Sequence, residues 1–153
     1  MSQENVEIVR RWVAAMNGEP ASMAAAVAQW FEEDSDYYPV RKFPEARPAH
    51  GREEMAHWMR LFNEGFPRSH WEIRELFSVG EDRVLAWMKL SAEGRGSAIA
   101  LWGDLYTCYW MRHGRFFRVE DHLTLSGALH ALGVESDTLE ADGLSEQDAH
   151  SDS

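Results

Sequence analysis

The sequence contains a single cysteine, Cys108, among its 153 residues. No disulfide can form within the chain, and no metal site built from several cysteines is possible. Hydrophobic runs long enough to span a membrane are also missing, and the first residues, MSQENVEIVRR, are typical of neither a signal peptide nor a transit peptide. These absences predict a cytoplasmic protein.

Positive charge is scarce, because 15 Lys and Arg stand against 26 Asp and Glu and the net charge is −11. Such a chain lacks the basic field that phosphate backbones and anionic membranes require, so we expect neither nucleic acid nor a membrane as partner. Residues 135–153 contain seven acids and no Lys or Arg, so they account for −7 and leave −4 for the rest. We expect this acidic tail to be mostly disordered and residues 1–134 to form one domain.

Aromatic residues are abundant, with seven Trp, seven Phe and four Tyr. A core of this size needs fewer large rings, and such a surplus usually lines a pocket or an interface. Seven histidines are present, but none has the H-x-H or H-E-x-x-H spacing of a metal site. We therefore expect no metal and no cofactor. His57 lies beside an apolar stripe and is either a pocket residue or, as we favour, a surface histidine.

Helical spacing of apolar residues dominates the first 65 positions. One helix is expected from Ser2 to Asn17-Gly18, a second over residues 21–31, and a third from Gly51 to Gly65. The acidic run 32–34 is expected to form a turn, residues 35–40 a short strand and residues 41–50 a loop.

After Pro67 the apolar period changes to two, as in strands. Four strands are predicted, at 71–79, 83–93, 97–112 and 115–124, followed by a helical turn at 126–132. Short, glycine-bearing junctions make neighbouring strands antiparallel hairpins in a meander. Helices segregated before a meander predict an α+β fold, with N-terminal helices packed on a curved antiparallel sheet.

Strand alternation sorts side chains by face. In 97–112, one face carries Leu105, Thr107 and Tyr109. In 115–124, one face is predicted to carry Phe117, Val119, Asp121 and Leu123. An aspartate on an otherwise apolar face is a candidate general acid or base, because desolvation raises its pKa toward neutrality. The alternative is a structural carboxylate that accepts hydrogen bonds from backbone amides or pairs with a surface arginine.

Several strings resemble the SnoaL-like superfamily over roughly residues 3 to 134. They are RRWVAAMNGEP, the acidic run before YYP, the helix start GREEM, and GRGSAIALWGDLYTCYWMRHGRFFRVEDHLTLSGALHALGV. The resemblance implies the cone-shaped fold shared by nuclear transport factor 2, ketosteroid isomerase and polyketide cyclases. Members use the cavity between the concave sheet and the helices.

The functional residues of this superfamily can be compared with the matching positions of this sequence one by one. Ketosteroid isomerases use a tyrosine that donates a hydrogen bond to the developing oxyanion, an aspartate that acts as the base, and a second aspartate at the oxyanion. The corresponding positions in this sequence are Trp12, Tyr38 and Thr107. All three are replaced, which disfavours steroid isomerisation, and inward positions do not supply the Asp-Arg-Asp set of the epoxide hydrolases. The acid/base aspartate of the polyketide cyclases matches Asp121, although Glu120 stands where a tryptophan is usual.

Three functions remain open, all built on this fold. The first is cofactor-independent cyclase, isomerase or hydratase chemistry on a small apolar cyclic metabolite, in a cavity of roughly 300 to 1,000 Å³. The second is binding without turnover, and the third is a dimerisation or docking domain. The predicted catalytic residue is Asp121, and the predicted substrate-binding residues are Trp12, Tyr38, Trp58, Phe62, Leu105, Thr107, Tyr109 and Val119.

A homodimer is also expected. The outward side of the predicted sheet carries large rings that are too apolar to leave in water. They are Trp87, Trp102, Tyr106 and Trp110.

Overall fold

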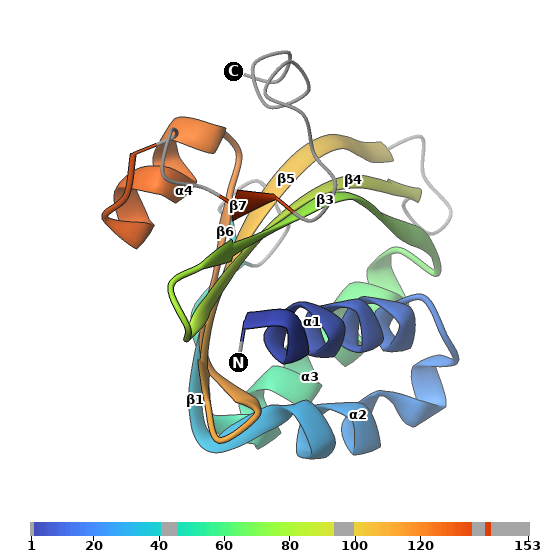
Figure 1. Cartoon of the computed structure of the whole chain (residues 1–153). Helices are drawn as coiled ribbons and strands as arrows, with labels where there is room; N and C mark the ends of the chain where they lie inside the picture. The colour runs from blue at the N-terminus through green and yellow to red at the C-terminus, as the bar shows by residue number, and fades with distance from the viewer. Residues whose placement is uncertain (1, 41–45, 94–99, 136–139, 142–153) are drawn as a thin grey trace.

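Three helices lie against the concave side of one curved sheet (Figure 1). The computed structural model describes residues 2–40, 46–93, 100–135 and 140–141. The helices are α1 (Ser2–Met16), α2 (Met23–Trp30) and α3 (Gly51–Gly65), and a 3-10 turn, Pro20–Ser22, precedes α2. All three predicted helices are present, and the predicted α+β class is confirmed.

The predicted meander is also present. Its strands are β3 (Arg68–Val79), β4 (Arg83–Glu93), β5 (Ala100–Arg112) and β6 (Arg115–His122), each antiparallel to the next. Residues 97–99 of the predicted third strand lie outside the described residues. The whole sheet has the order β2-β1-β6-β5-β4-β3-β7.

The acidic run 32–34 is part of a strand, which corrects the predicted turn and the predicted end of the second helix. Strand β1 (Phe31–Tyr38) pairs with the short β2 (Ala49–His50) and runs parallel to β6, with a register shift between Phe31 and Asp36. Arg112 and His113, at the β5–β6 hairpin, both contact the Glu32 carboxylate. These contacts favour a strand in an acidic segment whose local sequence disfavours one.

The outer face of the sheet is covered in part by the chain itself. Helix α4 (Leu125–Leu132) lies on the face opposite to α1–α3 (Figure 1). It forms a second apolar cluster with β4 and β5, in which Trp87 and Tyr106 are buried. These two rings are therefore buried within one chain and need no partner subunit to cover them. The predicted homodimer now depends on Trp110, which is half-buried, and on Trp102, whose side chain lies outside the described residues.

The acidic tail contributes one short element to the sheet. Strand β7 (Glu140–Ala141) pairs with β3 at Phe77 and Ser78. Residues 136–139 and 142–153 lie outside the described residues, so the prediction of a mostly disordered tail stays a prediction.

Candidate functional site

Two strand pairings bring the site residues together. His113 and Gly114 both have positive φ values and join β5 to β6 in a two-residue turn. The register set by this turn would pair Thr107 with Glu120, but a one-residue shift between Trp110 and Met111 places Thr107 directly opposite Asp121. On the other side of β6, Tyr37 of β1 pairs with Val119, two residues before Asp121 and on the same face. Asp121 therefore lies between hydroxyl-bearing residues of two neighbouring strands.

A β-bulge in β6 decides which residues of this strand face the helices. Trp110 pairs with Arg118 but Met111 pairs with Phe116, so Phe117 is an extra residue in β6. Phe116 is consequently buried in the core, whereas Phe117 lies under the Arg112 guanidinium. The prediction that Phe117 faces inward is wrong for this reason. Leu123 follows the end of β6 and is 50% exposed, so its predicted inward position is wrong too.

The Asp121 carboxylate accepts a hydrogen bond on each of its oxygens. The Thr107 hydroxyl donates to Oδ1 over 2.7 Å, and the Tyr37 hydroxyl donates to Oδ2. Asp121 is only 8% exposed, and its two hydrogen-bond partners are buried as well. The two hydroxyl groups thus fix the plane of the carboxyl group inside the domain.

Burial raises the pKa of Asp121 from its ordinary 3.8 to about 6, against the opposing effect of the hydrogen bonds from Tyr37 and Thr107 and of the charge on His122. Burial also raises the pKa of Tyr37 and of Tyr109, and the nearby Asp121 charge adds to both shifts. Tyr37 therefore stays protonated and remains a donor. Asp121 is the one group of the three that exchanges a proton near neutral pH.

Asp121 lies in the wall of a small internal cavity of about 20 Å³. A single water molecule needs about 10–15 Å³ of such space, whereas small-molecule pockets usually measure about 300–1,000 Å³. The predicted size of the cavity is therefore wrong. The wall consists of aromatic rings, methionines and three other residues. They are Trp12, Phe31, Tyr37, Trp58, Phe62, Trp71, Tyr109, Met16, Met55, Met59, Met88, Thr107, Val119 and Asp121.

Seven of the nine predicted site residues lie in this wall. They are Trp12, Trp58, Phe62, Thr107, Tyr109, Val119 and Asp121. Leu105 is buried in the same apolar core but does not line the cavity.

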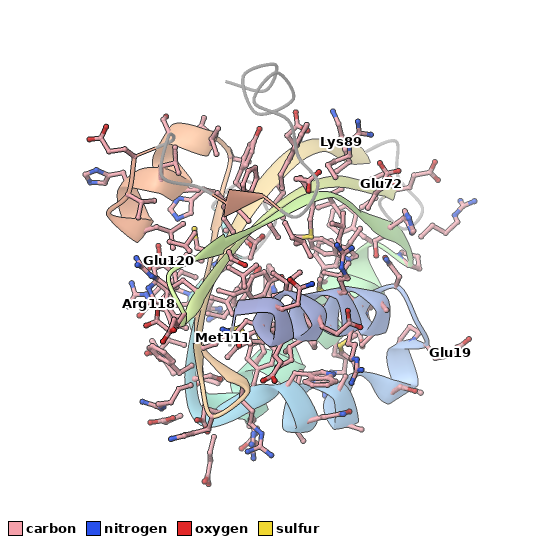
Figure 2. All side chains as sticks on the ribbon, viewed as in Figure 1. Glu19, Glu72, Lys89, Met111, Arg118 and Glu120 are labelled. Carbon is pink, nitrogen blue, oxygen red and sulfur yellow. The ribbon has the colours of Figure 1, made fainter. Side chains whose placement is uncertain are left out.

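The placement of Tyr38 in the cavity is wrong, because the strand alternation directs Tyr37 inward and Tyr38 to the opposite face. The Arg118 guanidinium lies 4.7 Å from the centre of the Tyr38 ring, and it also binds the Glu120 carboxylate. Figure 2 shows Arg118 and Glu120 on the outer side of the sheet, with Met111 toward α1. Sequence reasoning missed Tyr37, which only the pairing of β1 with β6 identifies.

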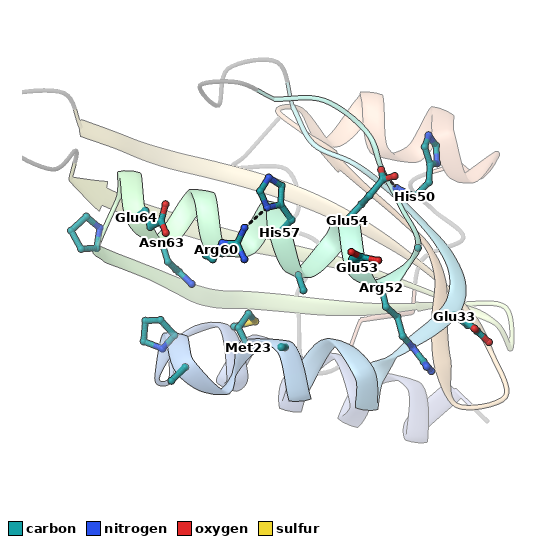
Figure 3. Close-up of a pocket in the computed structure, with 16 residues that line it drawn as sticks. Met23, Glu33, His50, Arg52, Glu53, Glu54, His57, Arg60, Asn63 and Glu64 are labelled. Carbon is teal, nitrogen blue, oxygen red and sulfur yellow. Dashed lines mark hydrogen bonds between the residues drawn. The ribbon is translucent and has the colours of Figure 1, made fainter.

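A second, larger hollow lies outside the core. It is an open groove of about 1360 Å³ between α2 and α3, and Figure 3 shows residues of both helices along it. His57 lies here and contacts Arg60, so it is a surface residue and not part of the Asp121 cavity. Both acidic and basic side chains line this open groove, whereas the inner cavity holds a buried carboxyl group with a raised pKa. We therefore take the inner cavity as the candidate site.

Within the described residues, no group of three His, Cys, Asp or Glu side chains is arranged to hold a metal ion. No helix in the described part of the chain is long and apolar enough to cross a membrane.

Comparison with known proteins decides the family. Residues 9–119 match the SnoaL-like domain. This chain belongs to the SnoaL-like domain family. The match ends two residues before Asp121, so it covers the cone and most of the cavity wall but not the carboxyl group itself. None of the curated proteins matches the chain.

Solved structures share the fold of this SnoaL-like chain at low sequence identity. Bal32a, from a soil-derived mobile gene cassette, has a TM-score of 0.69 and 18% identity, with 79% of this chain and 89% of the other covered. A hypothetical protein with a ketosteroid isomerase-like fold from Catenulispora acidiphila, solved in complex with trimethylamine, has a TM-score of 0.66, 22% identity, and coverage of 86% and 95%. A protein from Jannaschia sp. CCS1, provisionally described as a SnoaL-like polyketide cyclase, has a TM-score of 0.65, 16% identity, and coverage of 88% and 94%.

Proposed function

We propose that this SnoaL-like chain binds a small, largely apolar metabolite in its cone and that Asp121 transfers a proton to or from it. The observation that carries the proposal is a carboxyl group buried in an aromatic wall and held by two hydroxyl donors. A pKa of about 6 leaves Asp121 mostly ionised at neutral pH, yet close enough to neutrality to exchange a proton in either direction. This matches cyclase, isomerase or hydratase chemistry without a cofactor.

Each residue of the wall has a role in this proposal. Asp121 acts as the base, and Tyr37 and Thr107 hold its carboxylate in one orientation. Trp12 and Trp58 provide flat apolar surfaces that orient the substrate. The Tyr109 hydroxyl offers the substrate a further hydrogen bond, because it stays protonated at neutral pH.

The cavity must enlarge before any metabolite enters. Four methionines contribute to its wall, and unbranched methionine side chains change rotamer more readily than aromatic rings. Met55 and Met59 lie on α3, so a small movement of that helix together with these side chains opens space beside Asp121.

The small cavity also supports a second candidate, in which the domain binds a ligand or a partner without turnover. A nearly filled cone favours a non-catalytic role, and Asp121 then serves as a cross-link between β1, β5 and β6. The trimethylamine of the Catenulispora structure is a ligand of that protein. For this chain it is a reason to include small amines among the compounds tested.

The test is proton exchange at carbon. Small cyclic ketones are incubated with the protein in D₂O, and deuterium at the carbon beside the carbonyl is followed by NMR. The wild type should accelerate the exchange, and Asp121→Asn should abolish the acceleration. Asp104→Asn is the matched control, since Asp104 binds Lys89 and Trp87 outside the cavity.

Two results separate the candidates. Exchange that persists unchanged in Asp121→Asn refutes the acid/base assignment. Saturable binding of ketones or amines without any exchange supports the non-catalytic candidate.

A further inference from the structure

The Asp121 cavity has one negative group and no positive one. No lysine, arginine or histidine stands among the described residues that line it. His122 follows Asp121 in the chain, but its ring contacts Glu120, and Arg118 binds the same Glu120 on the outer face. A carboxylate taken out of water is costly unless a positive charge compensates it, and none of the described residues that line this cavity supplies one.

Aromatic rings supply most of the remaining wall. Seven of the fourteen lining residues are Trp, Tyr or Phe. Near the carboxylate, the Tyr37 and Trp58 ring centres are 6.0 Å apart, and the Trp58 and Phe62 ring centres are 6.2 Å apart. Aromatic faces carry partial negative charge and attract organic cations, and alkylated ammonium ions are bound in cages of this kind.

The hydrogen bonds that Asp121 already accepts indicate which kind of ammonium group fits beside it. Two of the roughly four acceptor positions of a carboxylate are already used by Tyr37 and Thr107. A primary ammonium group would bring three N–H donors into a wall that offers few acceptors, and unpaired donors are costly when buried. An ammonium nitrogen surrounded by alkyl groups has few or no such donors, and its alkyl groups fit against aromatic rings.

We infer that the ligand of this cavity carries an alkylated ammonium group, with Asp121 as its counter-ion and the aromatic wall as its cage. The inference rests on the proposed function in taking the same cavity as the binding site, and it adds the charge of the ligand. The net charge of −11 acts in the same direction, because it attracts cations toward the protein. A cation beside Asp121 also keeps the carboxyl group ionised, which is the form that acts as a base.

Choline and its uncharged isostere, in which carbon replaces the nitrogen, provide the probe. The two molecules have the same shape, so the cost of enlarging the cavity cancels when their affinities are compared. Binding is measured by calorimetry and by tryptophan fluorescence at constant ionic strength. We expect choline to bind the wild type roughly tenfold or more tightly than the isostere.

Variants then assign the preference to the cavity. Asp121→Asn should remove most of the preference for choline, whereas Asp104→Asn, which changes the net charge equally, should keep it. Trp58→Leu should weaken choline binding more than binding of the isostere, and Trp110→Leu, outside the cavity, should change neither.

The comparison on the wild type needs no variant and decides the inference by itself. Equal affinity for choline and the isostere, or no detectable binding of choline, overturns it. Binding of the isostere with an affinity equal to that of choline leaves the proposed binding of apolar molecules intact. The proton-exchange experiment tests the role of Asp121 as a base separately.

Discussion

Replacing Asp121 with asparagine should stabilise the protein at neutral and alkaline pH. The folded state holds this carboxyl group at a pKa of about 6, compared with an ordinary value of 3.8. Folding must therefore keep an ionised group in an environment that disfavours its charge. The difference of about two pKa units corresponds to about 3 kcal/mol of unfolding free energy at high pH. Asparagine has the same shape and no charge, so it removes this cost.

The sign of the pH dependence follows from proton binding. Between pH 3.8 and pH 6, the folded state binds more protons at this site than the unfolded state does. The contribution of Asp121 to stability is therefore greatest at low pH, falls as the pH rises from about 3.8 to about 6, and is constant above that. Lowering the pH from 8 to 5 recovers about 1.4 kcal/mol in the wild type.

Urea denaturation of both proteins at pH 5 and pH 8 measures this effect. The difference between wild type and Asp121→Asn cancels the titration of every other group. At pH 8 we expect the variant to be more stable than the wild type by about 3 kcal/mol, minus any loss from a weaker hydrogen bond to Tyr37 or Thr107. At pH 5 this stability difference should be smaller by about 1.4 kcal/mol. A stability difference that does not change with pH, or a variant that is less stable at pH 8, would refute the reasoning.

Three further predictions concern the carboxyl group, the tail and assembly. Tyr37→Phe removes a hydrogen bond that favours the ionised form, so the pKa of Asp121, followed by NMR of its carboxyl carbon, should rise above that of the wild type; an unchanged pKa would show that the bond is absent in solution. Truncation after Val134 should lower the melting temperature only slightly, because the described part of the tail adds two residue pairs, those of β7, to the sheet, and a fall of many degrees would contradict this. We also propose that the protein is a homodimer through the outer sheet face, and sedimentation at tens of micromolar as a monomer would oppose this.

Much of the fold follows from local sequence patterns. The 3.6-residue period before Pro67 and the two-residue period after it are properties of backbone geometry, so they predict helices and strands without knowledge of contacts. The ends of α3 and of β4 coincide with the predicted ones. Alternation along each strand also predicted that Thr107, Tyr109, Val119 and Asp121 share one face. This prediction holds because the bulge at Phe117 shifts by one residue the register that the two-residue turn sets.

Other features depended on contacts between distant segments. The acidic run at 32–34 became strand because Arg112 and His113, about 80 residues later, lie beside it. Tyr37, not Tyr38, reached Asp121 because β1 pairs with β6 in one register, which alternation within β1 alone does not reveal. The bulge at Phe117 changed the face of a residue whose local pattern predicted the opposite.

The same division applies to the site and to the surface. Sequence alone placed Asp121 on the same strand face as Val119, since strand alternation is a local property, whereas the bulge at Phe117 decided that this face points toward the helices. Only the tertiary structure decided how much space remains beside Asp121, because cavity volume depends on how side chains from α1, α3 and five strands pack together. The tertiary structure likewise decided that Trp87 and Tyr106 are buried in one apolar cluster with α4, because burial depends on where the chain returns and not on the strand pattern.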